Sequence, residues 1–157
     1  MMSVEHPIFS PTRRQLLTAG SGAIVISPLP LKAIAAEVDL LRARTELFGN
    51  GAIQEGRVTV KLPPIAENGH SVPITVTVDS PLTADDYVKR VAILSPRNPL
   101  PNIAQHHFTP LSGKAEVSSR IRMSGTQAIQ AVAEMSDGSL WSGSMETVVT
   151  LAACVVL

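Results

Sequence analysis

Little in this sequence points to a metal or nucleotide site. Its 157 residues include one cysteine and four histidines, and there is no CxxC or HExxH motif, so a structural zinc site is not indicated. The sequence also has no P-loop, no GxGxxG motif and no Ser-His-Asp order. We therefore expect no bound cofactor and no catalysis by these familiar arrangements.

Aromatic residues and runs of charge are also scarce. Phe, Trp and Tyr together make up 3% of the sequence, so a folded core must be built from Val, Ile, Leu and Ala. Basic and acidic residues balance at 13 each, without a run of either sign. This balance gives no reason to expect nucleic acid or an anionic membrane as a partner.

The first 36 residues are typical of an export signal. Arg13 and Arg14 form a twin-arginine pair, and a mildly apolar stretch follows at 16–31. That stretch is too short, and too interrupted by Gly, Ser and Pro, to span a bilayer. Residues 33–36, Ala-Ile-Ala-Ala, supply a cleavage site. The sequence predicts a twin-arginine signal peptide over 1–36 and a periplasmic protein. The alternative is a poorly ordered N-terminus with a chance Arg-Arg pair.

The single cysteine, Cys154, stands close to the end of this sequence, with only Val155, Val156 and Leu157 after it. A lone thiol in an exported protein is free, paired with another chain or chemically loaded. No Lys, Arg or His lies in 147–157, so nothing local activates this thiol as a nucleophile. A thiol that another protein modifies needs no such activation. The alternatives are a small buried hydrophobe and an intermolecular disulfide.

Residues 37–150 predict one all-β domain that follows a short helix. The helix is predicted over 38–48, with Val38, Leu41, Thr45 and Phe48 on one face and Gly49 as its C-terminal cap. After the helix, apolar and polar residues alternate as in β-strands. Seven strands are predicted, at 57–62, 71–78, 88–94, 104–109, 114–123, 126–135 and 140–151.

The number of strands and the turns between them indicate the fold class. Asp137-Gly138, between the last two strands, predicts a type I′ hairpin. Seven short strands separated by turn residues favour an immunoglobulin-like antiparallel β-sandwich. The last strand runs almost to Cys154, so residues 151–157 are expected to form an arm that leaves one end of the sandwich. From Leu151, such an arm extends the thiol by roughly 10 Å.

Four other groups of residues are interpreted as structural. His106 and His107 are adjacent in a strand and point to opposite faces, so they are expected to be an exposed pair at a strand edge rather than metal ligands. Asp85-Asp86, after Thr83, indicates a turn or cap. Residues 98–101, Asn-Pro-Leu-Pro, indicate a rigid surface loop that presents a contact. The methionines at strand positions, Met123, Met135 and Met145, are expected to be packing residues.

Several segments together resemble those of SoxY, the sulfur-carrier family of bacterial thiosulfate oxidation. They are the twin-arginine leader, residues 64–69, 72–76, 98–101, 119–122, 136–138 and 149–151, and the near-terminal cysteine. The resemblance covers the chain from about Phe48 to Cys154.

The resemblance implies a carrier subunit rather than an enzyme. In such a protein, Cys154 is the covalent attachment site for sulfur intermediates, and no other residue inherits a chemical role. The implied partners are a SoxZ-like subunit in a heterodimer and, transiently, a SoxAX-like cytochrome, a SoxB-like hydrolase and a sulfane dehydrogenase. The alternative function is a non-catalytic periplasmic binding or assembly module with a structural or cross-linking cysteine.

The tail differs from that of the family it resembles. The family typically ends in Gly-Gly-Cys-Gly-Gly, whereas here Ala152-Ala153 precede Cys154 and Val-Val-Leu follows it. Glycine gives an arm the most backbone freedom, and valine is stiff because it is β-branched. The sequence therefore predicts a bulkier and stiffer arm, which suits enzymes with wide clefts or a different sulfur pathway.

Overall fold

The computed structural model of this chain describes residues 31–153. The predicted signal residues 1–30, with Arg13 and Arg14, and the tail 154–157, with Cys154, lie outside the described residues. The elements are α2 (Leu31–Phe48), β1 (Ile53–Glu55), β2 (Val58–Lys61), β3 (Ile65–Asn68), β4 (Val72–Val78), β5 (Val88–Leu94), β6 (Asn102–His107), the 3-10 turn η1 (Pro110–Ser112), β7 (Glu116–Ile121), β8 (Gln127–Met135) and β9 (Leu140–Leu151).

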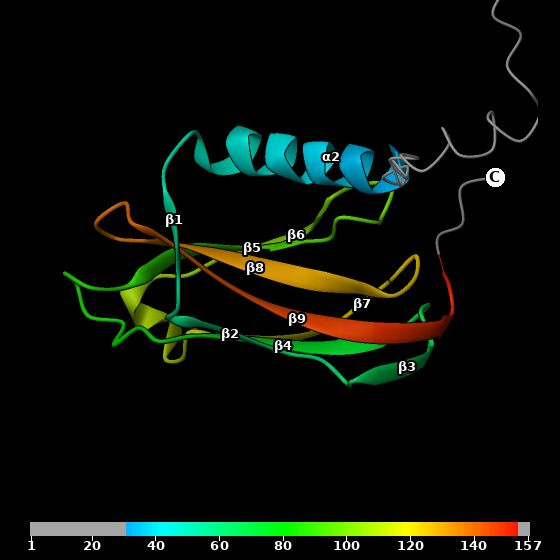
Figure 1. Cartoon of the computed structure of the whole chain (residues 1–157). Coiled ribbons are helices and arrows are strands. Elements are labelled where there is room, and N and C mark those ends of the chain that lie inside the picture. Colours follow the sequence, from blue (N-terminus) through cyan, green and yellow to red (C-terminus); the bar gives the residue numbers. More distant parts are fainter. Residues whose placement is uncertain (1–30, 154–157) are drawn as a thin grey trace, which may run out of the picture. The chain divides into compact units, whose positions relative to one another are not determined.

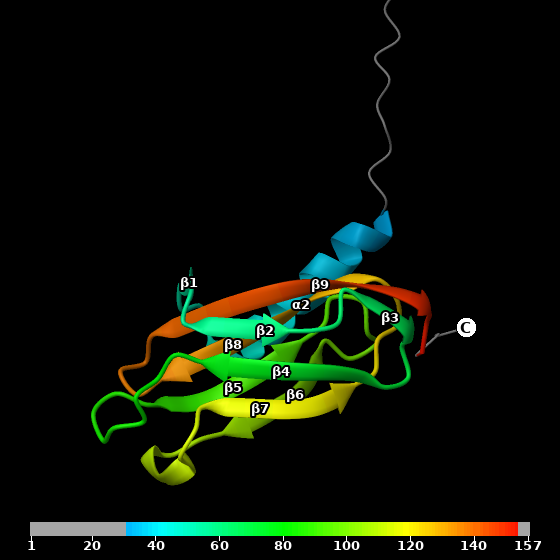
Figure 2. The same cartoon turned by 90° about the horizontal axis from the view of Figure 1, so that it is seen from below.

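Two β-sheets face each other across the core, as the sequence predicts for an immunoglobulin-like sandwich (Figure 1, Figure 2). In the described chain, the larger sheet has the order β1-β9-β8-β5-β6, with β3 also paired to β9. The smaller sheet has the order β2-β4-β7. Most neighbouring strands are antiparallel, but β1 and β3 both pair with β9 in parallel.

The alternation of apolar residues explains how each strand contributes to the core. In β4, Val72, Ile74, Val76 and Val78 are buried, and the residues between them face outward. Each such side chain contributes roughly 1.5–3 kcal/mol when it is fully buried. Met123 and Met135 are completely buried and Met145 packs against the same core, so the prediction that these methionines are packing residues is confirmed.

The helix α2 packs on the outer face of the larger sheet, through a face that shares only Phe48 with the predicted one (Figure 1). Leu40, Leu47 and Phe48 contact the small cluster that contains Leu94 on β5. The prediction is confirmed for Phe48 and wrong for Val38 and Leu41, which are 48% and 51% exposed. The face was misassigned because the packed stripe includes Ala43 and Arg44, which a search for large apolar residues passes over.

The helix is also longer at its start than predicted. It begins at Leu31, inside the segment 1–36 that the sequence assigns to the signal peptide. At its end, Gly49 has φ 70° and donates a hydrogen bond to the Thr45 carbonyl at 2.8 Å, which confirms the predicted glycine cap. No helix within residues 31–153 is long and apolar enough to cross a membrane.

The hairpin between β8 and β9 forms where it was predicted, with a different turn. A type I′ turn needs a positive φ at both central residues. Here Gly138 has φ 83°, but Asp137 is not among the described non-glycine residues with positive φ. Gly138 donates to Met135 at 3.0 Å and Met135 donates to Ser139 at 2.9 Å. These bonds define a three-residue turn with a glycine bulge. The Asp137 carboxylate favours this conformation, because it accepts a hydrogen bond from Ser139 N at 2.8 Å.

Two strands in the described chain were not predicted. β1 has three residues and β3 has four, too few for an alternation to be recognised, and both gain their partners from β9. The seven predicted strands all form, and those at 88–94 and 140–151 have the predicted bounds.

Candidate functional site

The residue that the sequence singles out, Cys154, lies outside the described residues, so the site is defined by the point where its segment leaves the sandwich. That point is Ala153, which is 3% exposed. Its backbone N–H donates to the Met123 carbonyl at 3.0 Å. The chain is therefore held in the fold up to the residue immediately before the cysteine.

Three hydrogen bonds connect the end of the described chain, at 151–153, to two other segments. Gly69 donates to the Leu151 carbonyl at 2.8 Å, and Met123 donates to the Gly69 carbonyl at 2.8 Å. With the Ala153–Met123 bond, they join the end of β9, the loop after β3 and the second residue after β7. We call these four residues, Gly69, Met123, Leu151 and Ala153, the anchor.

The anchor places the start of the arm later than the sequence suggested. Residues 151–157 were predicted as the arm, but Leu151 is the last residue of β9 and Ala153 is hydrogen bonded. Consecutive Cα atoms are about 3.8 Å apart, so the thiol of Cys154 stays within about 7 Å of the Ala153 Cα. The reach beyond the last held residue is thus shorter than the roughly 10 Å estimated from Leu151.

Close packing around Gly69 makes this arrangement specific. A Cβ atom on Gly69 would lie 2.4 Å from the Met123 carbonyl oxygen, 3.1 Å from Ala153 N and 3.1 Å from the Leu151 oxygen. No other residue type fits without moving the backbone of the anchor. Sequence reasoning gave Gly69 no role, and its position in the 64–69 segment was the only signal available.

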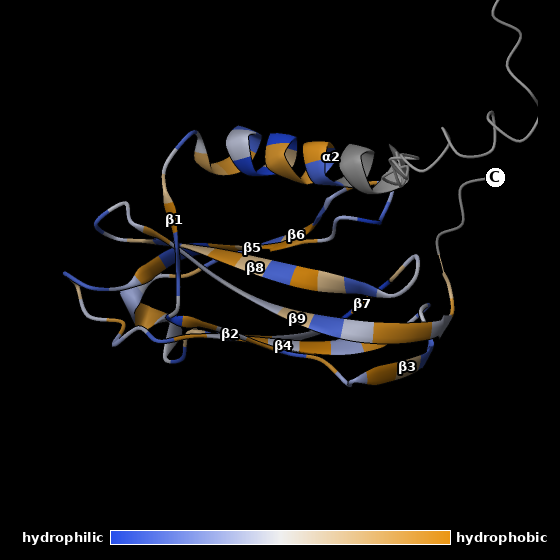
Figure 3. Ribbon diagram, viewed as in Figure 1, coloured by the Kyte–Doolittle hydropathy of each residue, from blue (hydrophilic) through white to orange (hydrophobic). Residues whose placement is uncertain are grey.

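An apolar surface lies beside the anchor. Ile65 on β3 is 61% exposed, and Val148 and Leu151 on β9 are 46% and 59% exposed. Ile65 and Val148 are register partners in the parallel β3–β9 pair. Figure 3 shows hydrophobic colours along β3 and the end of β9.

A groove of about 380 Å³ opens near the same end of the sandwich, and we call it the Leu100 groove. Leu100, 76% exposed, belongs to the predicted 98–101 loop. Asn98 fixes this loop, because its amide donates to the Arg122 carbonyl at 2.8 Å and accepts from Ser124 N at 3.0 Å. The groove is lined by Asn98, Pro99, Leu100, Asn102, Ile103, Arg120, Ile121 and Arg122.

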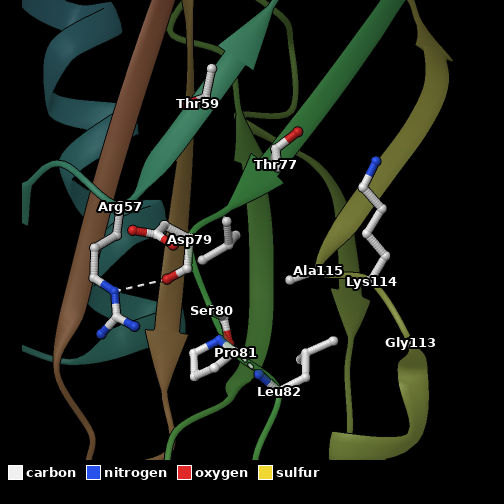
Figure 4. A pocket seen from close by; sticks show the side chains of 11 residues that line it. Arg57, Thr59, Thr77, Asp79, Ser80, Pro81, Leu82, Gly113, Lys114 and Ala115 are labelled. Carbon is white, nitrogen blue, oxygen red and sulfur yellow. Dashed lines mark hydrogen bonds between the residues drawn. The ribbon is translucent and has the colours of Figure 1, made fainter.

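A second pocket, of about 530 Å³, lies at the opposite end of β4 (Figure 4). Its two cations already have acidic partners. Arg57 lies 3.2 Å from Asp86 and donates to the Asp79 carbonyl at 2.9 Å, and Lys114 lies 2.8 Å from Glu116. The hydrogen bond from Lys114 lowers the pKa of Glu116 below its usual value.

The length of β4 separates this second pocket from the anchor. Six residue steps along a strand span about 20 Å, which is well beyond the reach of a thiol held within about 7 Å of Ala153. The pocket in Figure 4 therefore takes no part in chemistry at Cys154.

The two histidines lie on β6, the edge strand of the larger sheet. His107 is exposed as predicted, but His106 is half-buried and its Nε2 atom is buried, so the prediction of an exposed pair is wrong for His106. Within residues 31–153, no group of three or more His, Cys, Asp or Glu side chains is placed to hold a metal ion. Asp86 closes a turn, because its N–H donates to the Thr83 hydroxyl at 3.0 Å.

Comparison with known proteins identifies relatives. The sequence matches the family described as sulfur oxidation protein SoxY over residues 44–154. Its fold is similar to that of the sulfur carrier protein SoxY from Chlorobium limicola f thiosulfatophilum, with a TM-score of 0.64 and 30% identity over 74% of this chain and 96% of that chain. No curated protein sequence matches this chain.

More distant solved structures share only the fold. A superoxide reductase (neelaredoxin) from Ignicoccus hospitalis has a TM-score of 0.53 and 16% identity, over 60% of this chain and 80% of that chain. A putative superoxide reductase from Thermotoga maritima has a TM-score of 0.51 and 15% identity, over 62% of this chain and 87% of that chain.

Proposed function

This chain belongs to the SoxY family of sulfur oxidation proteins, and from that premise we propose that it holds sulfur intermediates of thiosulfate oxidation covalently on Cys154. The family and the similar Chlorobium structure support the role of sulfur carrier. The observation that carries the proposal is the anchor, which fixes Ala153 at the surface end of the sandwich, one residue before the only thiol.

The chemistry of loading needs nothing from the carrier except the thiol. Oxidative attachment joins Cys–SH and thiosulfate to give Cys–S–S–SO₃⁻ with release of one proton and two electrons, which a cytochrome partner accepts. Hydrolysis of that adduct by water then releases sulfate and two protons and leaves a persulfide anion, Cys–S–S⁻. Both steps occur in partner enzymes, so this chain serves as carrier and not as catalyst.

The short reach of Cys154 sets a requirement for those partners. A thiol within about 7 Å of Ala153 reaches only shallow or wide active sites, because the sandwich itself would collide with the walls of a deep, narrow one. The β-branched residues Val155 and Val156 add bulk on the other side. We therefore expect the cytochrome, the hydrolase and the sulfane dehydrogenase that serve this chain to contact the sandwich itself.

The proposal includes export and a partner subunit. The twin-arginine pair Arg13-Arg14 supports export of the folded chain to the periplasm. A SoxZ-like subunit that lacks its own signal leaves the cell with it as a heterodimer. The test of both is co-purification from the periplasmic fraction, with Arg13→Lys/Arg14→Lys as the variant that keeps the charge and abolishes twin-arginine export.

Intact-mass measurement tests the carrier function directly. Protein isolated from cells grown on thiosulfate should carry a mass increase of one thiosulfate unit or of one or more sulfur atoms, which dithiothreitol removes. The Cys154→Ser variant should carry none and should support no growth on thiosulfate. Turnover of thiosulfate without any sulfur-containing adduct on Cys154 would falsify the proposal.

The burial of Ala153 favours one alternative function. A residue 3% exposed next to the cysteine suits a scaffold whose thiol is structural or cross-links two subunits. Alkylation under native conditions separates the two functions. A carrier reacts with iodoacetamide in minutes while folded, whereas a structural thiol reacts only after unfolding in urea.

A further inference from the structure

Charged side chains are distributed unequally between the two ends of the sandwich. The segments that meet around the anchor are 62–71, 95–103, 119–126 and 148–153. They contain three arginines, Arg97, Arg120 and Arg122, and a single acidic residue, Glu67. This end of the sandwich, where β9 and β7 terminate and β4 begins, lies at the right of Figure 2.

Within residues 37–153, these arginines differ from most other cations in having no acidic partner. Arg57, Lys89, Arg90 and Lys114 all form ion pairs with carboxylates. Within residues 31–153, Arg97, Arg120 and Arg122 form none, and all three are exposed. Their positive charge is thus available to an anion from outside the fold.

Two of these arginines lie next to the anchor, one through a hydrogen bond and one through the chain. Arg120 donates to the carbonyl and hydroxyl oxygens of Ser71 at 3.3 Å, and Ser71 lies two residues after Gly69. A guanidinium has five N–H donors, so the others of Arg120 remain for a ligand. Arg122 directly precedes Met123, whose carbonyl accepts the hydrogen bond from Ala153.

The Leu100 groove supplies the space between these arginines and the loop 98–101. Arg120 and Arg122 line it on one side, and Asn102 on β6 lines it on the other. The side-chain oxygen of Asn102 is buried without a hydrogen-bond partner in the described chain. An acceptor oxygen does not attract an anion, so the donors that this groove offers are the guanidinium N–H groups of Arg120 and Arg122.

We propose that Arg120 and Arg122, at the rim of the Leu100 groove, bind the sulfonate end of a sulfur oxyanion as it is attached to or held on Cys154. Sulfonate presents three oxygens with delocalised negative charge, and the planar fork of arginine matches such oxyanions. The site adjoins the anchor through the backbone, because Arg122 precedes Met123 and the Met123 carbonyl accepts from Ala153 N at 3.0 Å. This inference rests on the proposed function, since it names what the carried adduct contacts.

The reaction of the thiolate with tetrathionate tests the site without any partner enzyme. The thiolate displaces thiosulfate, Cys–S⁻ + S₄O₆²⁻ → Cys–S–S₂O₃⁻ + S₂O₃²⁻, and intact mass follows the product. Iodoacetamide alkylates the same thiol but is neutral. The ratio of the two rate constants therefore reports attraction of the anion and cancels any change in access to the thiol.

The decisive variant is Arg120→Gln/Arg122→Gln. For charges about 8 Å from a dianion in water, removing both arginines should lower the tetrathionate-to-iodoacetamide ratio about tenfold at ~10 mM ionic strength and about threefold at ~150 mM. The matched control, Lys89→Gln/Lys114→Gln, removes two charges at the far ends of β5 and β7 and should change the ratio less than twofold. The Arg120→Lys/Arg122→Lys variant should restore most of it.

A ratio for the glutamine variant that is no lower than for the control overturns the proposal, as does a failure of the lysine variant to restore it. Titration of Cys154→Ser with sodium thiosulfate gives a second measurement that needs no thiol. The Nε–H resonances of Arg120 and Arg122 should shift saturably, relative to sodium chloride at equal ionic strength, and a shift without saturation also overturns it. Absence of sulfur on Cys154 in cells would contradict the proposed carrier function. The rate ratio and the thiosulfate titration use purified protein, so they test the anion site independently of that result.

Discussion

Replacing Gly69 with alanine tests how the cysteine-bearing segment is held. Gly69 is buried, donates to Leu151 and accepts from Met123, each at 2.8 Å. The new Cβ would lie 2.4 Å from the Met123 carbonyl oxygen, about 1 Å closer than van der Waals contact allows. That oxygen is the acceptor for Ala153, so relief of the clash moves the acceptor away from its donor.

The magnitude follows from these contacts. Two hydrogen bonds of the anchor weaken, at about 1 kcal/mol each, and overpacking adds about 1–3 kcal/mol. Alanine also reduces the entropy of the unfolded chain, which offsets about 0.4–1 kcal/mol. We expect Gly69→Ala to lower the free energy of unfolding by about 2–5 kcal/mol. Local opening at Ala153 should become easier by about 2 kcal/mol, or roughly 30-fold in amide exchange.

Hydrogen exchange measured by NMR at Ala153 and Met123 is the assay, with the alkylation rate of Cys154 as a second measurement. Gly143→Ala is the matched control, because its Cβ would lie 2.1 Å from the Val58 carbonyl oxygen, away from the anchor. It should destabilise the fold to a similar degree and leave exchange at Ala153 governed by global unfolding. Unchanged exchange at Ala153 in Gly69→Ala would refute the role that we assign to the anchor.

Three further substitutions have defined outcomes. Thr147→Val should raise the free energy of unfolding by about 1–2 kcal/mol in urea denaturation, because the Thr147 hydroxyl is fully buried and has no hydrogen-bond partner within residues 31–153. Asn98→Ala should cost about 1–3 kcal/mol and speed amide exchange at Ser124, since it removes bonds that hold the 98–101 loop. Ser139→Ala should raise the pKa of Asp137, which the Ser139 hydroxyl lowers from 3.8; an NMR titration of the carboxyl checks this.

The sign of the last effect is fixed by linkage. A carboxyl group whose folded pKa is lowered stabilises the fold above its ordinary value of 3.8, and this contribution is lost as the pH falls through the folded pKa. The difference between thermal melts of Ser139→Ala and of the wild type should therefore be larger above about pH 4 and shrink in stronger acid to a constant remainder, because the hydrogen bond from Trp141 Nε1 to the Ser139 hydroxyl is lost at every pH. A difference that is largest in strong acid would contradict the assignment.

Much of the fold could be predicted because the strands alternate cleanly. Residues 72–78 place buried and outward-facing side chains in strict alternation, and 88–94 ends at Ser95-Pro96, so the bounds of these strands could be read from the sequence. The sequence did not predict β1 and β3. Both are short strands that form only by pairing with β9, a long-range contact that no local pattern encodes.

The base of the candidate site could not be predicted for the same reason. Gly69, Met123 and Ala153 are far apart in the sequence and meet through backbone N–H and C=O groups. Almost every residue type carries these groups, so the residue types give no sign of the contact. Composition and periodicity indicate only that Gly69 lies in a loop and that Met123 comes after a strand. The lack of space for a Cβ at Gly69 is what makes the contact depend on sequence, and it becomes visible only in three dimensions.

The anchor changes what an enzyme must recognise in this carrier. A long glycine arm presents sulfur alone, because the enzyme contacts little beyond the arm. Here the thiol stays within about 7 Å of a buried residue, so an enzyme that reaches it also meets the surface around Ala153. At the same end of the sandwich lie an apolar area, Ile65, Val148 and Leu151, and the exposed Arg120 and Arg122. Under the proposed function, selection of partners depends on this end of the sandwich as much as on the sulfur adduct, and substitutions of Ile65 should alter enzyme turnover without altering the loading of Cys154 by tetrathionate.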